Sequence, residues 1–154
     1  MWLILHLLFL TASPPTGCSV SEVQTFLPDL IGPARGSGPW LVDGANGRWA
    51  WAQNLPTKTL WILPTTRARV VIRGRELNSG TKTRFQVGGP DSAITDAMIV
   101  DDPWRASVIP GGATWEVKNR YLFLSSQVYY PSVGCYEFDI TVGSEHRTIT
   151  HELK

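Results

Sequence analysis

Residues 131–154 read PSVGCYEFDITVGSEHRTITHELK, and this stretch predicts the fold. Apolar and polar side chains alternate along residues 135–142, and a second run, residues 147–153, follows the turn residues Gly143-Ser144-Glu145. The apolar set of the first run is Tyr136, Phe138, Ile140 and Val142. Successive strand side chains point to opposite faces, so this period of two indicates a strand with one buried face and one wet face. We expect an antiparallel hairpin that closes the domain.

Further short runs precede this hairpin, separated by Gly, Pro and Asn turn signals. They cover residues 47–53, 57–63, 68–77, 82–87, 113–117 and 121–130. Asn78-Ser79-Gly80 predicts a hairpin between 68–77 and 82–87, in which Gln86 points outward. Residues 88–112 lose the period and predict a long connection between sheets. About eight strands at this spacing favour an all-β fold, an antiparallel immunoglobulin-like β-sandwich, with a small β-barrel as the alternative.

Length and charge narrow the class of protein. A chain of 154 residues is long enough for one domain with its own core. The net charge is +1 and 18% of residues are charged, which lacks the basic footprint of a nucleic-acid-binding protein. We therefore expect no nucleic-acid partner.

The N-terminus has the character of a signal peptide. Residues 2–10 are apolar apart from His6, and small residues and prolines follow. This run matches a signal-peptide core and is too short to span a bilayer. We assign residues 1–17 to a signal peptide, 18–39 to a tether or irregular lead-in rich in Pro and Gly, and 40–154 to the β-sandwich domain. A buried first strand or helix is the alternative for the apolar run.

Cys18 has three alternative fates. Pro15-Thr16-Gly17-Cys18 is similar to a lipobox, although Pro15 stands where Leu or Val is usual. A lipidated Cys18 would anchor the protein to a membrane through its acyl chains. An oxidising compartment would instead permit a disulfide with Cys135, the only other cysteine. In the third alternative Cys18 is free or removed. We predict lipidation of Cys18, which leaves Cys135 unpaired.

Several segments together resemble a family. They are Asn46-Gly47, residues 58–62 (KTLWI), residues 71–77 (VIRGREL) and residues 130–138 (YPSVGCYEF). These resemble small, uncharacterised bacterial secreted proteins and lipoproteins that share a "GRxL" segment and a C-terminal "PxxGCW/Y" hairpin. The resemblance implies an exported β-sandwich and assigns no catalytic residue.

The sequence offers little for chemistry. His146 and His151 are five apart, which places them on opposite faces of a strand, so we expect no metal site. No G-x-S-x-G elbow and no P-loop is present, and Cys135 has no visible base beside it. We expect no cofactor and no catalytic residue, and we favour a non-enzymatic protein.

Three tryptophans are the candidate ligand-binding residues. Trp49 and Trp51 share one face of a strand, and Trp61 lies on the next run. Such rings either fill a sandwich core or, if exposed, stack on sugars or anchor a protein partner. The leading hypothesis is an exported, non-enzymatic binding or structural domain of the cell envelope, lipid-anchored or extracellular. The alternatives are a carbohydrate-recognition module that uses the Trp pair and an exported enzyme with an unreadable site.

Overall fold

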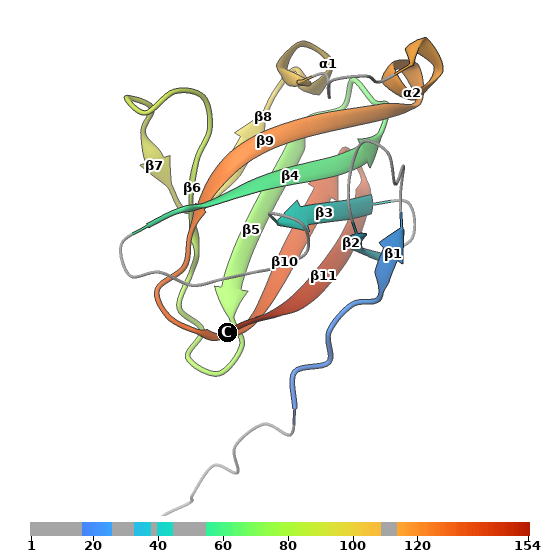
Figure 1. Ribbon diagram of the computed structural model, residues 1–154. Coiled ribbons are helices and arrows are strands. Elements are labelled where there is room, and N and C mark those ends of the chain that lie inside the picture. Colours follow the sequence, from blue (N-terminus) through green and yellow to red (C-terminus); the bar gives the residue numbers. More distant parts are fainter. Residues whose placement is uncertain (1–16, 26–32, 38–39, 45–54, 109–113) are drawn as a thin grey trace, which may run out of the picture.

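The computed structural model describes residues 17–25, 33–37, 40–44, 55–108 and 114–154. These residues form mostly β-strands, drawn in Figure 1. In chain order the elements are β1 (Val23–Thr25), β2 (Pro33–Ser37), β3 (Trp40–Gly44), β4 (Thr57–Pro64), β5 (Val70–Glu76), β6 (Arg84–Gln86), β7 (Ile94–Thr95), β8 (Met98–Val100), α1 (Pro103–Ala106), α2 (Trp115–Arg120), β9 (Tyr121–Tyr129), β10 (Gly134–Val142) and β11 (Glu145–Leu153).

The strands form two sheets. A seven-stranded sheet has the order β1-β2-β3-β4-β9-β6-β7, and a four-stranded sheet has the order β11-β10-β5-β8. Every pairing between these strands is antiparallel. The sheets lie one in front of the other (Figure 1), and the ladders do not close them into a barrel within the described segments. The predicted antiparallel β-sandwich is confirmed.

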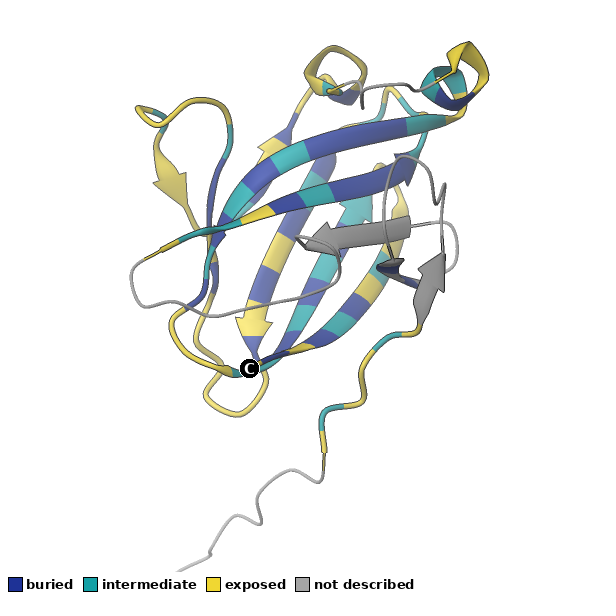
Figure 2. Cartoon of the chain, viewed as in Figure 1, coloured by how far each residue is buried: buried dark blue, intermediate teal, exposed yellow. Residues whose placement is uncertain are grey.

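The closing hairpin forms as its alternation predicts. β10 and β11 pair from Gly134↔Leu153 to Val142↔Glu145. Tyr136, Phe138 and Ile140 are buried, while the residues between them are partly accessible. Figure 2 shows this as alternating bands along the strand. The inner face of the hairpin therefore supplies one wall of the core.

A cluster of aromatic rings joins the two sheets. Trp61 on β4 meets Phe138 on β10 edge to face, with ring centroids 5.1 Å apart. Phe85 lies 6.4 Å from the Trp61 ring and 6.2 Å from the Phe138 ring. The indole N–H of Trp61 donates to Ser126 Oγ at 2.9 Å, which satisfies its one polar atom inside the core.

Gly74 is required by the packing of this cluster. It lies directly opposite Phe138 in the β5–β10 ladder. A Cβ atom added to Gly74 would overlap the Phe138 ring and would lie 2.5 Å from Thr83 Oγ1. Gly74, in the Gly74-Arg75-Glu76-Leu77 segment, thus makes room for Phe138, in the segment that begins at Gly134-Cys135. These two segments of the family resemblance lie against each other in the fold.

The predicted hairpin after β5 is only partly correct. Thr83 N–H donates to Gly74 O at 2.9 Å, so the chain does turn back beside β5. It then leaves for the other sheet, where β6 pairs with β9. Gln86 points to the face opposite Phe85, as predicted, but it is buried there, because its amide donates to the carbonyls of Pro90 and Ser92 and accepts from the Tyr129 hydroxyl. A satisfied amide can be covered on the face that a polarity pattern assigns to solvent.

Two other predictions are wrong. Residues 113–117 were expected to form a strand, yet α2 begins at Trp115, and the Thr114 side chain caps it by accepting from Val117 N. The segment 18–39 is predicted to be a tether or irregular lead-in, yet β1 and β2 within it pair with each other, and β2 continues the sheet to β3. Ladder hydrogen bonds between these successive strands, continued from β3 to β4, override the Pro- and Gly-rich composition that suggests a linker.

Candidate functional site

Cys18 and Cys135 form a disulfide, with Cα atoms 5.5 Å apart and a sequence separation of 117. The N-terminal segment reaches this position along β11, where Ser21 N–H donates to Thr150 O at 2.8 Å and Ser21 Oγ accepts from Thr150 N–H at 2.9 Å. The sulfur of Cys18 is therefore unavailable for a diacylglyceryl thioether. This corrects the prediction that Cys18 is lipidated and Cys135 unpaired, because both sulfurs are used in one bond.

Of the three candidate ligand-binding tryptophans, Trp61 is buried, so the prediction that it binds a ligand is wrong. Its side chain is 0% exposed and belongs to the core between the sheets. Trp49 and Trp51 lie outside the described residues. Trp61 therefore cannot form part of an exposed aromatic platform.

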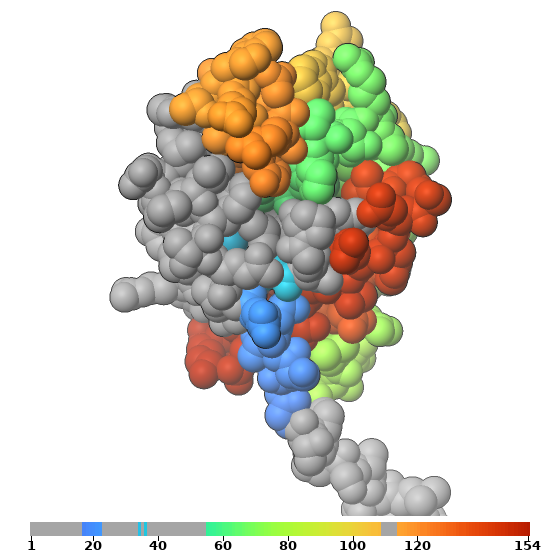
Figure 3. Space-filling model, turned by 90° about the vertical axis from the view of Figure 1, so that its right-hand side faces the viewer, coloured from blue at the N-terminus to red at the C-terminus, as the bar shows by residue number. Residues whose placement is uncertain are grey.

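The exposed tryptophans that the structure does reveal are Trp104 and Trp115. Trp104 on α1 is 41% exposed and Trp115 on α2 is 78% exposed. Both line one shallow hollow of about 190 Å³ at the end of the sandwich where α1 and α2 lie. We call this hollow the tryptophan hollow, and its other lining residues are Ser107, Lys118, Asn119 and Leu122. Figure 3 shows α2 in orange at the top of the molecule.

Local packing explains why Trp115 points outward. Residues of a helix advance by about 100° each, so Trp115 and Val117 face roughly opposite directions. Val117 is buried in a second apolar cluster with Ile62 and Phe123, which anchors α2 on the outer face of the β4–β9 pair. Burying Val117 therefore leaves the indole of Trp115 in solvent.

The floor of the tryptophan hollow is fixed by the start of β9. Phe123 N–H donates to Ser107 Oγ at 3.0 Å, and Val108 N–H donates to Phe123 O at 2.8 Å. Asn119 is held from its own helix, because its amide donates to Trp115 O at 3.1 Å. These bonds place α1 and α2 on a rigid sheet and leave their tryptophans accessible.

Around the tryptophan hollow, more cationic side chains than carboxylates lack an ion pair among the described residues. Arg67 lies over the Trp104 ring at 5.7 Å, within the range of a cation–π contact. Lys118 in the hollow and Arg105 on α1 make no ion pair within the described residues. Of the nearby carboxylates, Asp101 pairs with Arg69, Glu116 pairs with Arg120, and Asp102 accepts from Arg105 N–H at 3.2 Å as the cap of α1. The balance at this end favours an anionic ligand.

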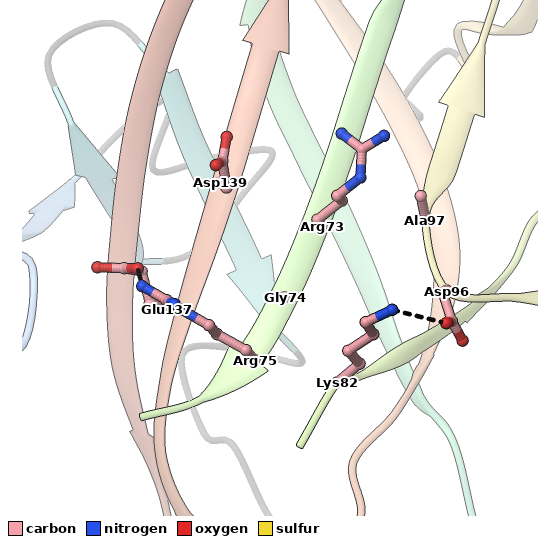
Figure 4. Close-up of a pocket in the computed structure, with 8 residues that line it drawn as sticks. All are labelled: Arg73, Gly74, Arg75, Lys82, Asp96, Ala97, Glu137 and Asp139. Carbon is pink, nitrogen blue, oxygen red and sulfur yellow. Dashed lines mark hydrogen bonds and ion pairs between the residues drawn. The ribbon is translucent and has the colours of Figure 1, made fainter. Parts of the chain in front are cut away.

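A second surface is a charged groove of about 490 Å³ on the outer face of the four-stranded sheet. It is lined by Arg73, Gly74, Arg75, Lys82, Asp96, Ala97, Glu137 and Asp139 (Figure 4). Arg75 pairs with Glu137 at 2.8 Å and Lys82 pairs with Asp96 at 3.2 Å, as the dashed lines in Figure 4 mark. Positive and negative side chains are equal in number here, so most of the charge is compensated internally.

Glu76 is a buried carboxylate at the end of β5. Its side chain is 4% exposed and accepts from Ser79 N–H at 2.6 Å. Burial raises the pKa of this carboxyl, but hydrogen bonds from Ser79, Asn78 and Cys135 outweigh it, so the pKa is lowered overall. The ionised form is therefore the one that the turn at residues 77–80 stabilises.

We expect Glu76→Gln to destabilise the protein near pH 7 and to reduce the dependence of its stability on pH. A lowered pKa in the folded state stabilises the fold above the ordinary value of 4.5, and this contribution is lost as pH falls through the folded pKa. The free energy of unfolding in urea should fall by about 1 to 3 kcal/mol at pH 7, with a smaller difference at pH 3. A difference of equal size at both values of pH would contradict a role for the ionised carboxylate.

His151 lies in the core and not in a cleft. Its side chain is 0% exposed, and its ring stacks on Phe138 with centroids 5.2 Å apart and on Tyr136 at 6.0 Å. A catalytic site built on His151 would need the imidazole to meet carboxylates in an accessible cleft. The imidazole instead packs among aromatic rings, so this position gives the hypothesis no support.

Within the described residues, no three His, Cys, Asp or Glu side chains are grouped so as to hold a metal ion. Nor does any helix in those residues have the length and apolar character needed to cross a membrane.

A local sequence signal does mark the two exposed tryptophans. Trp104 follows Asp102-Pro103, and Trp115 follows Gly111-Gly112 and the cap residue Thr114. Asp or Thr before a short segment indicates a helix start, and a proline at its first position strengthens that signal. Trp104 lies outside the predicted strand runs and so has no core face assigned to it, whereas Trp115 lies in the run 113–117 and is distinguished from Trp61 by the helix-start signal at Thr114.

Comparisons with known proteins give one similar structure. No family model matches the chain, and no curated protein matches it in sequence. A crystal structure described as that of a putative lipoprotein from Bacillus anthracis aligns with 94% of this chain and 99% of its own, at a TM-score of 0.54 and 11% sequence identity. At this identity the likeness extends to the fold. The described residues therefore form an antiparallel β-sandwich of a kind also found in that bacterial protein.

Proposed function

We propose that the protein is an exported, non-enzymatic binding domain that acts in the bacterial cell envelope or outside the cell. The observation that carries this proposal is the Cys18–Cys135 disulfide. Disulfides form and persist mainly in oxidising compartments, and they are rare in the cytosol of ordinary bacteria. A bond between the only two cysteines of the chain fits a protein that folds after export.

The position of the disulfide supports a structural role outside the cytoplasm. It ties the segment that follows the predicted signal peptide to the start of β10. The apolar run at residues 2–10 is consistent with export, and the B. anthracis structure of the same fold is described as a putative lipoprotein. Because the disulfide occupies Cys18, the proposal does not include a lipid anchor on this residue.

The binding role is favoured over catalysis by the placement of reactive side chains. His151 is enclosed by aromatic rings, and both cysteines are oxidised. An accessible hollow carries two exposed tryptophans. Exposed aromatic rings on a rigid scaffold are typical anchors for a ligand or partner.

Cell fractionation combined with thiol trapping tests the proposal. The full chain carrying a C-terminal tag is expressed in a Gram-negative host, and each fraction is alkylated with a maleimide-polymer before and after reduction. We expect the chain in the periplasm, with both thiols protected until reductant is added, and an intact mass that lacks any acyl group. Cys18→Ser serves as the control, since it should leave one reactive thiol on Cys135.

Two results would count against the proposal. One is a chain that stays in the cytosol with both thiols reactive. The other is incorporation of labelled palmitate that Cys18→Ser abolishes, since this would show that the sulfur carries lipid and not a disulfide.

A further inference from the structure

We propose that the tryptophan hollow between α1 and α2 binds one sugar ring of an acidic carbohydrate. This inference rests on the proposed function as an exported binding domain and names the ligand class for it. Trp104 and Trp115 line this hollow, whereas Trp61 is buried in the core.

Two large aromatic rings are exposed on one small hollow. Trp104 and Trp115 are 41% and 78% exposed, although tryptophan is among the side chains that gain most from burial. Both are held on helices that a buried residue and β9 hydrogen bonds fix in place. The backbone that carries the rings is therefore ordered before a ligand arrives, which lowers the ordering cost of binding.

Apolar and polar groups are mixed on the wall of the tryptophan hollow. The hollow combines two indoles with the Lys118 ammonium and the Asn119 amide. A pyranose ring has apolar C–H faces and a rim of hydroxyl groups, so it can stack on indole while its rim meets donors and acceptors. Ligand sites in general combine aromatic walls with a few polar groups in this way.

The volume of the tryptophan hollow limits the size of its ligand. The hollow holds about 190 Å³, below the roughly 300–1,000 Å³ of clefts that enclose drug-sized ligands. It suits a single ring at a time, while the rest of a glycan chain remains in solvent. A ligand of about a dozen heavy atoms in an open site binds with a Kd of about 1 mM.

The cationic side chains at the tryptophan hollow outnumber the unpaired carboxylates beside them among the described residues. Lys118 lies in the hollow, and Arg67 and Arg105 flank it without an ion pair inside the described segments. Of the carboxylates on adjoining segments, Asp101 pairs with Arg69 and Glu116 pairs with Arg120, while Asp102, the cap of α1, makes no ion pair among the described residues. A sugar that carries a carboxylate would complete this unbalanced charge, whereas a neutral sugar would not.

Titrations of purified, oxidised protein test the inference with three probes. The acidic probe is a hyaluronan tetrasaccharide, the neutral probe is chitotetraose, and the acidic probe without sugar is tetraglutamate. Binding is followed by the indole N–H resonances in ¹H–¹⁵N spectra. We expect saturable shifts of the Trp104 and Trp115 signals with hyaluronan, an affinity at least about threefold weaker for chitotetraose, and no saturable indole shift with tetraglutamate.

Variants separate the contributions of stacking and charge. Trp115→Ala and Trp104→Ala should each weaken hyaluronan binding by about tenfold or more, and Trp115→Phe should have an intermediate effect. Lys118→Gln should weaken it by about threefold and reduce its sensitivity to salt. Arg73→Gln, which removes a cation from the charged groove on another face, is the matched control and should leave binding unchanged.

Several outcomes would overturn the inference. They are equal binding of chitotetraose and hyaluronan, equal binding of tetraglutamate, or no saturable shift with any probe. A concentration-dependent dimer that Trp115→Ala abolishes would assign the same surface to a second copy of the chain. Because the purified protein is used after oxidation, failure to bind sugar leaves the fractionation test of export unaffected, and failure of export leaves the binding result unaffected.

Discussion

Reduction of the Cys18–Cys135 disulfide is expected to lower the free energy of unfolding by about 4 to 5 kcal/mol. The bond closes a loop with a sequence separation of 117, and the chain-entropy model assigns a stabilisation of that size to a loop of about a hundred residues. Domains of this size are stable by about 5–15 kcal/mol, so the loss would remove a large share of the total. Urea unfolding of the oxidised and reduced protein measures it.

The double variant Cys18→Ser/Cys135→Ser gives the same comparison without reductant. It should match the reduced wild-type protein and should not respond to reductant itself. Ser21 would still bond to β11 in the folded variant, since those hydrogen bonds involve no cysteine. Identical urea midpoints for oxidised and reduced wild-type protein would show that the bond does not stabilise the fold.

Truncation of Phe138 should have an effect of similar size. Its ring contacts Trp61, Phe85, Tyr130 and His151 and covers Gly74, so Phe138→Ala leaves a cavity among rigid rings from both sheets. Replacing a buried Phe with Ala costs about 3 to 5 kcal/mol, because lost burial and the cavity add. We expect a loss in this range from urea or thermal unfolding of the oxidised protein.

Two variants are controls for Phe138→Ala: one keeps most of the side-chain volume, and the other introduces alanine elsewhere in the same strand. Phe138→Leu keeps most of the volume and should cost about 1 to 2 kcal/mol. Thr141→Ala changes a residue on the opposite face of the same strand, and it should cost less than about 1 kcal/mol. Equal losses for Phe138→Ala and Thr141→Ala would contradict a core position for the ring.

Side-chain periodicity predicted the strands of the central part of the fold. In β5 and β10, alternation of apolar and polar residues agrees with the observed burial. It worked there because each strand has one face on the core and one in solvent. It misassigned residues 113–117, since Trp115 and Val117 are two apart and point to opposite sides of a helix but to one side of a strand.

Burial could not be derived for the individual tryptophans. Trp61 and Trp115 are the same residue type, and both lie in runs predicted to be strands, yet one is 0% and the other 78% exposed. The difference comes from the partner surface: Trp61 faces β10 across the sandwich, whereas Trp115 lies on the side of α2 away from the sheet. Which surface a side chain meets depends on contacts between residues far apart in the chain.

The sequence by itself determined the antiparallel β class and the closing hairpin of residues 131–154, because both follow from a local period of two and from turn residues. The tertiary structure alone decided that Cys18 pairs with Cys135, that the lead-in segment contributes strands, and that Trp104 and Trp115 share a hollow. The disulfide joins residues 117 apart in the chain, the lead-in strands extend the sheet through β3 to β4, and both tryptophan-bearing helices contact β9. These arrangements depend on how the sheets and helices pack, which no local pattern encodes.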